Sequence, residues 1–199
     1  MLLLISCDQS NDRKEEVVLE KGESVYVNHF TESDTTFWTG NDGIHYGEVR
    51  DGYYYFEALD SSRRFNAPRF DIQSEDNFSV ESSIIGPTSD NSSYYGLVIG
   101  GYGAEKDFLE VSFNNSGKYK IDKGKRTKIN SGNFNMGDQG DFKKLKVLKK
   151  GTTCYFYLND ERVFTYELEK LMEFRCGPIT AKNSAVWMDY LKIEKETVR

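Results

Sequence analysis

Three carboxylates stand close together in the stretch Glu105-Lys106-Asp107-Phe108-Leu109-Glu110. Hydrolysis of a glycosidic bond with retention of configuration needs two carboxyl groups about 5–5.5 Å apart, one as nucleophile and one as acid/base. On a strand, Glu105 and Asp107 would share a face, and a bulge could bring Glu110 round to it. The alternative is a charged hairpin loop leading into a strand that begins near Phe108. The glycines at positions 100, 101 and 103 favour this loop.

Acylation is the second chemistry that the residues suggest. An apolar run ends in Leu4-Ile5-Ser6-Cys7, and the polar stretch Asp8 to Glu16 follows at once. This pattern resembles the lipobox of bacterial lipoproteins, in which the cysteine is acylated and becomes the mature N-terminus. The resemblance implies a lipid anchor on Cys7 and a place in the bacterial cell envelope, facing the periplasm or the cell surface. An ordinary apolar N-terminus with a chance cysteine is the alternative.

The elements that must position these residues form one predicted domain. We expect a truncated signal peptide and lipobox over residues 1–7, a polar tether over 8–22 and a β-sandwich over 23–196. Elsewhere the chain has no stretch near the roughly 18 apolar residues that a membrane span needs, so lipid would be its link to the membrane. The net charge of −6 argues against nucleic acid as a partner.

Short alternating segments and frequent turn signals predict an all-β chain. Aromatic residues make up 14% of the sequence, and such side chains favour strands. The dipeptides Asp51-Gly52 and Asn159-Asp160 separate apolar segments as hairpin turns do. Tyr95 to Ile99 has the nearly continuous apolar character of a strand buried on both faces. One short helix is expected over Thr165 to Phe174. The lysines between positions 143 and 150 are expected on the solvent face of a strand.

An ordered series of strand-like pieces resembles the concanavalin A-like lectin/glucanase jelly rolls of bacterial envelope proteins, including modules near the 3-keto-disaccharide hydrolase group. The pieces are Val49–Tyr54, Asn77–Glu81, Tyr95–Ile99, Asp107–Val111, Gly117–Tyr119, Lys144–Val147, Tyr155–Asn159 and Val186–Ile193. The resemblance implies a jelly-roll β-sandwich of two antiparallel sheets. In some glucanases of this fold a string similar to the carboxylate stretch carries catalysis, which would make Glu105 the nucleophile, Asp107 its partner and Glu110 the acid/base.

Aromatic side chains near turns are the candidates for binding a glycan, because sugar rings bury their C–H surface against flat rings. Trp38, Tyr46, Tyr94 and Tyr102 are the predicted binding residues, and Trp38 and Tyr102 are favoured because they neighbour glycine-rich loops. Trp187 is expected to belong to the core.

Metal and cofactor chemistry has little support in the sequence. His29 and His45 show no metal-ligand spacing, so no metal site and no cofactor are expected. Asn41, Asp42 and Asp51 could help to bind Ca²⁺, although turns are the simpler interpretation.

The remaining two cysteines allow a disulfide in an oxidising compartment. Cys154 and Cys176 form an even pair once Cys7 carries lipid. Two buried free thiols are the alternative, because spacing in the sequence does not show that the two residues meet.

Three functions therefore stay open. The first hypothesis is a non-catalytic, lipid-anchored module that binds a polysaccharide or another envelope component. The second is a glycoside-active enzyme of glucanase or keto-disaccharide hydrolase type on the same fold. The third is a structural lipoprotein that interacts with envelope proteins. Paired carboxylates in a cleft would favour the enzyme, and exposed aromatic rings without them would favour the binder.

Overall fold

The computed structural model describes residues 22–30, 35–87, 91–101, 108–124, 127–138, 140–168 and 174–196. Within these ranges every regular element is a β-strand. The same residues contain no helix that is long and apolar enough to cross a membrane.

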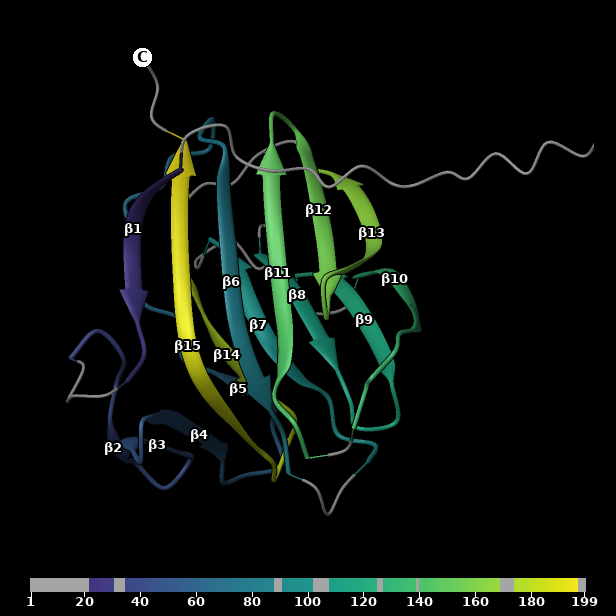
Figure 1. Ribbon diagram of the computed structural model, residues 1–199. Helices are drawn as coiled ribbons and strands as arrows, with labels where there is room; N and C mark the ends of the chain where they lie inside the picture. Colours follow the sequence, from purple (N-terminus) through teal and green to yellow (C-terminus); the bar gives the residue numbers. More distant parts are fainter. Residues whose placement is uncertain are drawn as a thin grey trace, which may run out of the picture.

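Two antiparallel sheets pack face to face (Figure 1). The nine-stranded sheet contains, in order, β13 (Glu161–Glu167), β12 (Thr153–Leu158), β11 (Lys143–Lys150), β6 (Phe78–Ile85), β15 (Ala185–Glu196), β4 (Tyr53–Ala58), β3 (His45–Arg50) and β2 (Gly40–Asn41), with β1 (Gly22–Asn28) also paired to β15. The six-stranded sheet contains β10 (Thr127–Asn133), β9 (Lys118–Lys123), β8 (Phe108–Phe113), β7 (Tyr95–Gly100), β14 (Cys176–Thr180) and β5 (Arg64–Phe65). This architecture confirms the predicted all-β jelly roll.

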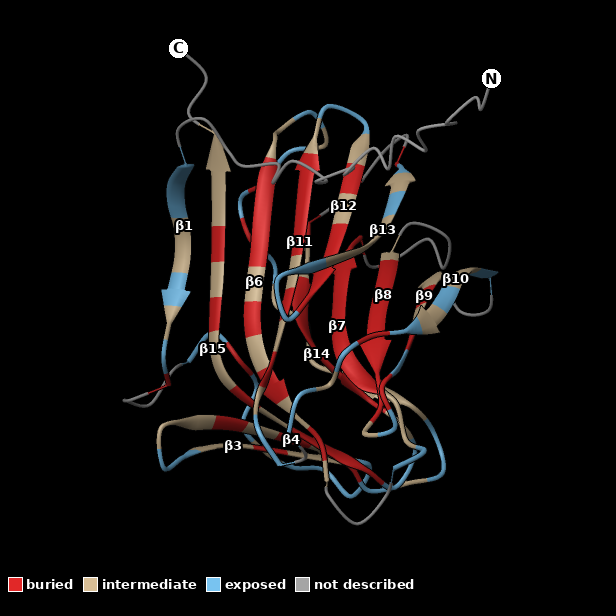
Figure 2. Cartoon of the chain, turned by 45° about the vertical axis from the view of Figure 1, so that its right-hand side comes forward, coloured by how far each residue is buried: buried red, intermediate tan, exposed pale blue. Residues whose placement is uncertain are grey.

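The core lies between the sheets and follows from alternation along the strands. Phe78, Val80 and Ile84 of β6 are fully buried and face the other sheet. The predicted strand β7 is buried at every position, as its continuous apolar run indicates. Figure 2 shows the central strands β6, β7 and β8 largely buried, while β1 and β10 are mostly intermediate or exposed. Burial of this apolar surface is the main source of the stability of the sandwich.

Strand β15 connects the two parts of the nine-stranded sheet. Along one edge it pairs with β6, and along the other it pairs first with β4 and then with β1. A bulge between Met188 and Tyr190 places Asp189 at an irregular position. Strands β2, β3 and β4 lie at one end of the sandwich, at the bottom of Figure 1, and run across the direction of the part of β15 that pairs with β1.

Two expectations about local structure are wrong in part. Thr165 belongs to β13, where it pairs with Tyr155 of β12, so the strand occupies the start of the expected helix. Positions 169–173 of that helix lie outside the described residues.

The second correction concerns the lysines of β11. Lys143 and Lys149 are buried at its two ends, where their Nζ atoms donate hydrogen bonds to the carbonyl oxygens of Asp138 and Asp76. Their stems cover the ends of the core, and their ammonium groups are satisfied by the backbone.

Candidate functional site

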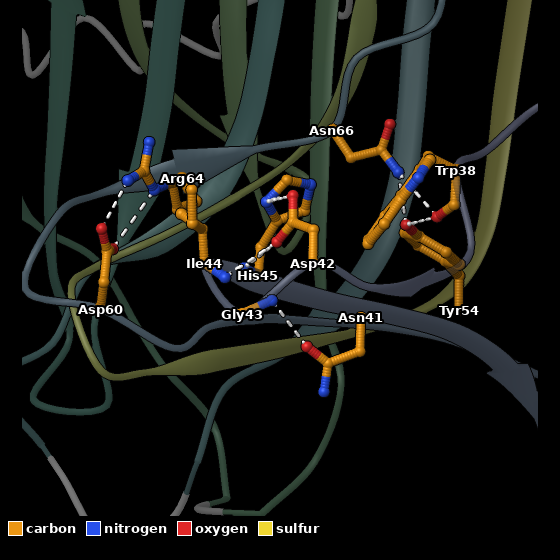
Figure 3. Close-up of polar contacts among 10 residues, drawn as sticks. All are labelled: Trp38, Asn41, Asp42, Gly43, Ile44, His45, Tyr54, Asp60, Arg64 and Asn66. Carbon is orange, nitrogen blue, oxygen red and sulfur yellow. Dashed lines mark hydrogen bonds and ion pairs between the residues drawn. The ribbon is translucent and has the colours of Figure 1, made fainter.

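Trp38 stands just before β2 and presents its ring at the surface, with 38% of the residue exposed. Its carbonyl oxygen accepts hydrogen bonds from the hydroxyl of the buried Tyr54, at 2.8 Å, and from the side-chain amide of Asn66, at 3.1 Å. Its ring lies 4.4 Å from that of His45, centroid to centroid. The core therefore holds the backbone of Trp38 while the indole stays accessible (Figure 3).

Glycine 47 makes this arrangement possible. A Cβ atom at Gly47 would lie 2.8 Å from both the carbonyl oxygen of Trp38 and the hydroxyl oxygen of Tyr54. Any side chain would push Trp38 away from β3. The same geometry shows that Trp38 lies on the core-facing side of β3, since Gly47 pairs with the buried Phe56.

The turn between β2 and β3 is built by its own polar side chains (Figure 3). The carboxylate of Asp42 accepts hydrogen bonds from the backbone N–H groups of Ile44 and His45, each at 2.8 Å, and lies 3.1 Å from His45 Nδ1. These bonds, first that from His45, hold the pKa of Asp42 below its usual range. Asn41 accepts the N–H of Gly43 in the same way.

The three residues considered for Ca²⁺ are not brought together. Asn41 and Asp42 stabilise the turn before β3, whereas Asp51 occupies the turn at the other end of this six-residue strand. Six residues of strand span about 20 Å, too far for one ion to be shared. Among the described residues no group of three or more His, Cys, Asp or Glu side chains has the geometry of a metal site.

Side chains from two more segments lie beside the ring pair of Trp38 and His45, with Asn66 next to the indole and with Ile44 and Arg64 beyond the imidazole (Figure 3). We define the Trp38 platform as Trp38, Ile44, His45, Arg64 and Asn66 (Figure 3). Ile44 is exposed, and Arg64 is held by two contacts to the carboxylate of Asp60, at 3.2 and 2.5 Å. This pair raises the pKa of Arg64 and lowers that of Asp60. The platform joins a flat ring to fixed donors and acceptors, the combination that a sugar ring and its hydroxyl groups require.

Glu110, the predicted acid/base, lies elsewhere, on the outer face of β8. It is 1% exposed and forms an ion pair with Arg63, while Lys120 Nζ lies 3.5 Å from its carboxylate. Lys120 also lies 3.5 Å from Asp122. Burial lowers the pKa values of Arg63 and Lys120. The carboxylate of Glu110 therefore lies between two cationic side chains. Glu105 and Asp107 lie outside the described residues, as do Tyr102 and Cys7.

The other predicted aromatic residues are divided between two faces. Tyr94 lies beside the Glu110 cluster, with Lys120 Nζ 4.7 Å from its ring centroid. Tyr46 points to the outer face of the nine-stranded sheet, opposite to Trp38, and its ring lies 5.9 Å from that of Tyr55. Trp187 was expected in the core, but it lies half-buried on this outer face. Its neighbours Val186 and Met188 are buried, so alternation along the segment was a signal that could have placed it correctly.

Both remaining cysteines are free thiols, and no disulfide joins them. Cys154 lies in β12 of one sheet and Cys176 in β14 of the other, each fully buried. Burial raises the pKa of the Cys154 thiol to about 12 and also raises that of Cys176. They therefore act as small apolar core groups.

The sequence matches no protein-family model and no curated protein. Solved structures do resemble the fold. A laminarinase (endo-1,3-β-glucanase) catalytic domain from Thermotoga petrophila is 10% identical with a TM-score of 0.66, and the match covers 90% of this chain and 100% of that one. A galectin-like protein of unknown function from Bacillus subtilis gives the same values.

An endo-β-1,3-glucanase from Pyrococcus furiosus is 10% identical with a TM-score of 0.65, covering 89% of this chain and 96% of that one. Identity at this level bears on architecture and not on activity. The chain has the concanavalin A-like jelly-roll fold of these glucanase domains.

Proposed function

We propose that this protein is a non-catalytic glycan-binding module and that it binds through the Trp38 platform. The observation that carries the proposal is the exposed indole of Trp38, whose backbone is fixed by Tyr54 and Asn66. A large aromatic ring kept at the surface loses the free energy of burial that the core would give it. A sugar ring stacked on the indole recovers that free energy by covering apolar surface.

The polar members of the platform supply the second requirement, which is orientation. Figure 3 shows the amide oxygen of Asn66 pointing away from its contacts with Trp38 and Tyr54. Arg64 presents its guanidinium group in a conformation fixed by Asp60. Fixed groups lose little conformational entropy when a ligand binds, so several weak contacts suffice for binding.

The known glucanases with this fold suggest which glycan to test first. The similar structures include endo-1,3-β-glucanases, so we propose a β-glucan as the ligand class. The non-catalytic part of the proposal rests on Glu110, whose carboxylate is held by Arg63 and Lys120 away from the Trp38 platform.

We further propose that the module acts in the bacterial envelope, attached to a membrane by lipid on Cys7. The support is the lipobox-like segment and the polar stretch after it. Palmitate labelling tests the lipid anchor. The wild type should be labelled, and a Cys7→Ala variant serves as the control. Equal labelling of both proteins would exclude Cys7 as the anchor.

Titration of the full chain with laminarin and with shorter β-1,3-oligosaccharides, followed by calorimetry, tests the binding. Trp38→Ala should weaken affinity at least tenfold, which corresponds to about 1.4 kcal/mol. Val27→Ala is the matched control, because Val27 is an exposed apolar residue on β1. Release of reducing sugar during the titration would support the enzyme instead. Absence of binding to every glycan in a broad panel would exclude the proposal.

A further inference from the structure

A hollow of about 430 Å³ opens on the outer face of the nine-stranded sheet, on the side opposite to the Trp38 platform. Its lining includes Arg50, Asp51, Tyr53, Ile85, Phe142 and Trp187. The volume falls at the lower end of the range of about 300–1,000 Å³ that is usual for small-molecule sites. It suits a ligand of one or two sugar rings.

The aromatic walls of the hollow are fixed by strand register. Trp187 of β15 lies between Tyr55 of β4 and Ile85 of β6, its partners on the two sides. Its ring is 4.9 Å from that of Tyr55, which supports it from the side. Tyr53 stacks on Phe142 with ring centroids 5.1 Å apart and planes at 15°. Rings that support one another keep their faces in place before a ligand arrives.

Charged groups stand at the rim of these walls. Arg50 pairs in register with Tyr53, and its guanidinium carbon lies 5.0 Å from the ring centroid of Tyr55. A carboxylate oxygen of Glu48 lies 2.9 Å from Nη1 of Arg50 and holds the guanidinium group in place. Asp51 occupies the turn that follows β3 with φ of 53°, and a glycine follows it. The hollow thus offers a donor fork and a carboxylate next to each other, beside flat apolar faces.

We propose that this hollow is a second saccharide subsite, which takes the end unit of a neutral glycan. The rings of Trp187 and Tyr53 cover the C–H face of the sugar, while Arg50 donates to its hydroxyl oxygens and Asp51 accepts from its hydroxyl groups. The proposal rests on the proposed function for the class of ligand, but it uses none of the same residues.

Two other classes of ligand fit the charges less well. A quaternary ammonium ion is attracted by aromatic faces, but here Arg50 places a positive charge on the wall. An acyl chain would bring no partner for the charges at the rim, which would lose hydration without compensation. A neutral sugar satisfies both the rings and the charges.

The two sites lie on opposite faces of the β3–β4 hairpin. Trp38 covers the core-facing side at Gly47, whereas Tyr46, Glu48 and Arg50 alternate onto the other side. Occupation of one site does not block the other. With both sites occupied, one chain would link two polysaccharide strands.

Calorimetric titration of the full chain with β-1,3-glucan oligosaccharides tests the inference through its stoichiometry. The wild type should bind two ligands per chain. Trp187→Ala and Arg50→Gln should each weaken binding in the hollow at least tenfold. Each variant should keep the Trp38 platform as its one site of unchanged affinity. Tyr190→Ala, which removes an aromatic residue of the same face outside the hollow, should leave two sites. Urea denaturation of each variant shows that the loss is not caused by unfolding.

The outcomes separate this proposal from the previous one. If Trp38→Ala alone removes all binding, the hollow is not a saccharide site and the Trp38 platform stands. If Trp187→Ala alone removes all binding, the platform fails and the hollow stands. Binding of tetramethylammonium in the hollow, with no competition by any sugar, would overturn the saccharide assignment.

Discussion

The guanidinium group of Arg63 forms an ion pair with the carboxylate of Glu110, which is 1% exposed and lies on the outer face of the six-stranded sheet. The two residues are 47 positions apart in the sequence. Their contact joins the chain just before β5 to the middle of β8. Removing one partner of a buried pair leaves the other charge without compensation, and this costs more free energy than the intact pair contributes.

We expect Arg63→Met to lower the free energy of unfolding by about 3 kcal/mol, at the lower end of the range for buried pairs because Lys120 remains near Glu110. The double variant Arg63→Met/Glu110→Gln should recover at least half of this loss, since it removes the uncompensated charge. Urea denaturation measures both values. Arg64→Met is the control, because its pair with Asp60 is about one-third exposed and screened by solvent, so its loss should change the free energy of unfolding much less.

Gly47→Ala should destabilise the chain by roughly 1–3 kcal/mol, since the new Cβ would lie 2.8 Å from Trp38 O and Tyr54 Oη. The variant should also change the fluorescence of Trp38. Gly22→Ala is the matched control, because the nearest atom to its Cβ is 3.6 Å away. Equal thermal midpoints for the two variants would contradict the tight packing of Trp38 on β3.

Asp42 should keep the β2–β3 turn folded well into the acid range. Its pKa is lowered in the folded chain, so the contribution of the carboxylate is fully present above the unfolded pKa of about 3.9 and is lost as the pH falls through the folded value. Hydrogen exchange should show the amides of Ile44 and His45 still protected at pH 4. Asp42→Ala should remove that protection, and Asp42→Asn should keep part of it because an acceptor remains.

The buried thiols should resist modification. In a Cys7→Ser chain, Cys154 and Cys176 should not react with Ellman's reagent at pH 8, and both should react in denaturant. Because burial raises the pKa of Cys154 to about 12, its stabilising contribution is present below the unfolded value of about 8.5 and falls as the pH rises towards 12. Rapid reaction of the folded chain, or a mass two units lower that reduction restores, would contradict the structure.

The regular part of the fold could be predicted because alternation and turn chemistry are local. Asp51 and Asn159, each the first residue of a predicted hairpin turn, have φ values of 53° and 49°, as such turns require. The start of the expected helix is a strand because a neighbouring strand pairs with it. The spacing of Leu168, Leu171 and Met172 resembles a helix, but Phe164 and Tyr166 favour a strand and β12 supplies the partner.

The site could be predicted only in part, because its geometry depends on contacts that sequence spacing does not contain. The neighbouring glycine-rich loop favours Trp38 as a binding residue, but its link to Asn66 joins residues 28 positions apart. Lys149 was placed in solvent because it follows an alternating pattern, yet the end of the core offered it a carbonyl group. The pairing of Arg63 with Glu110 has no signal in the sequence.

Strand β15 also separates the start of β1 from the proposed binding sites. Gly22, where β1 begins, pairs with Glu196 at one end of β15, while Trp187 lies near the other end. The nine residue steps from Trp187 to Glu196 span about 30 Å. A lipid on Cys7 would hold the end of the sandwich at which Gly22 enters, at the top of Figure 1. The β2–β4 end, with the Trp38 platform and the hollow, would then project away from the bilayer toward whatever glycan lies beyond it.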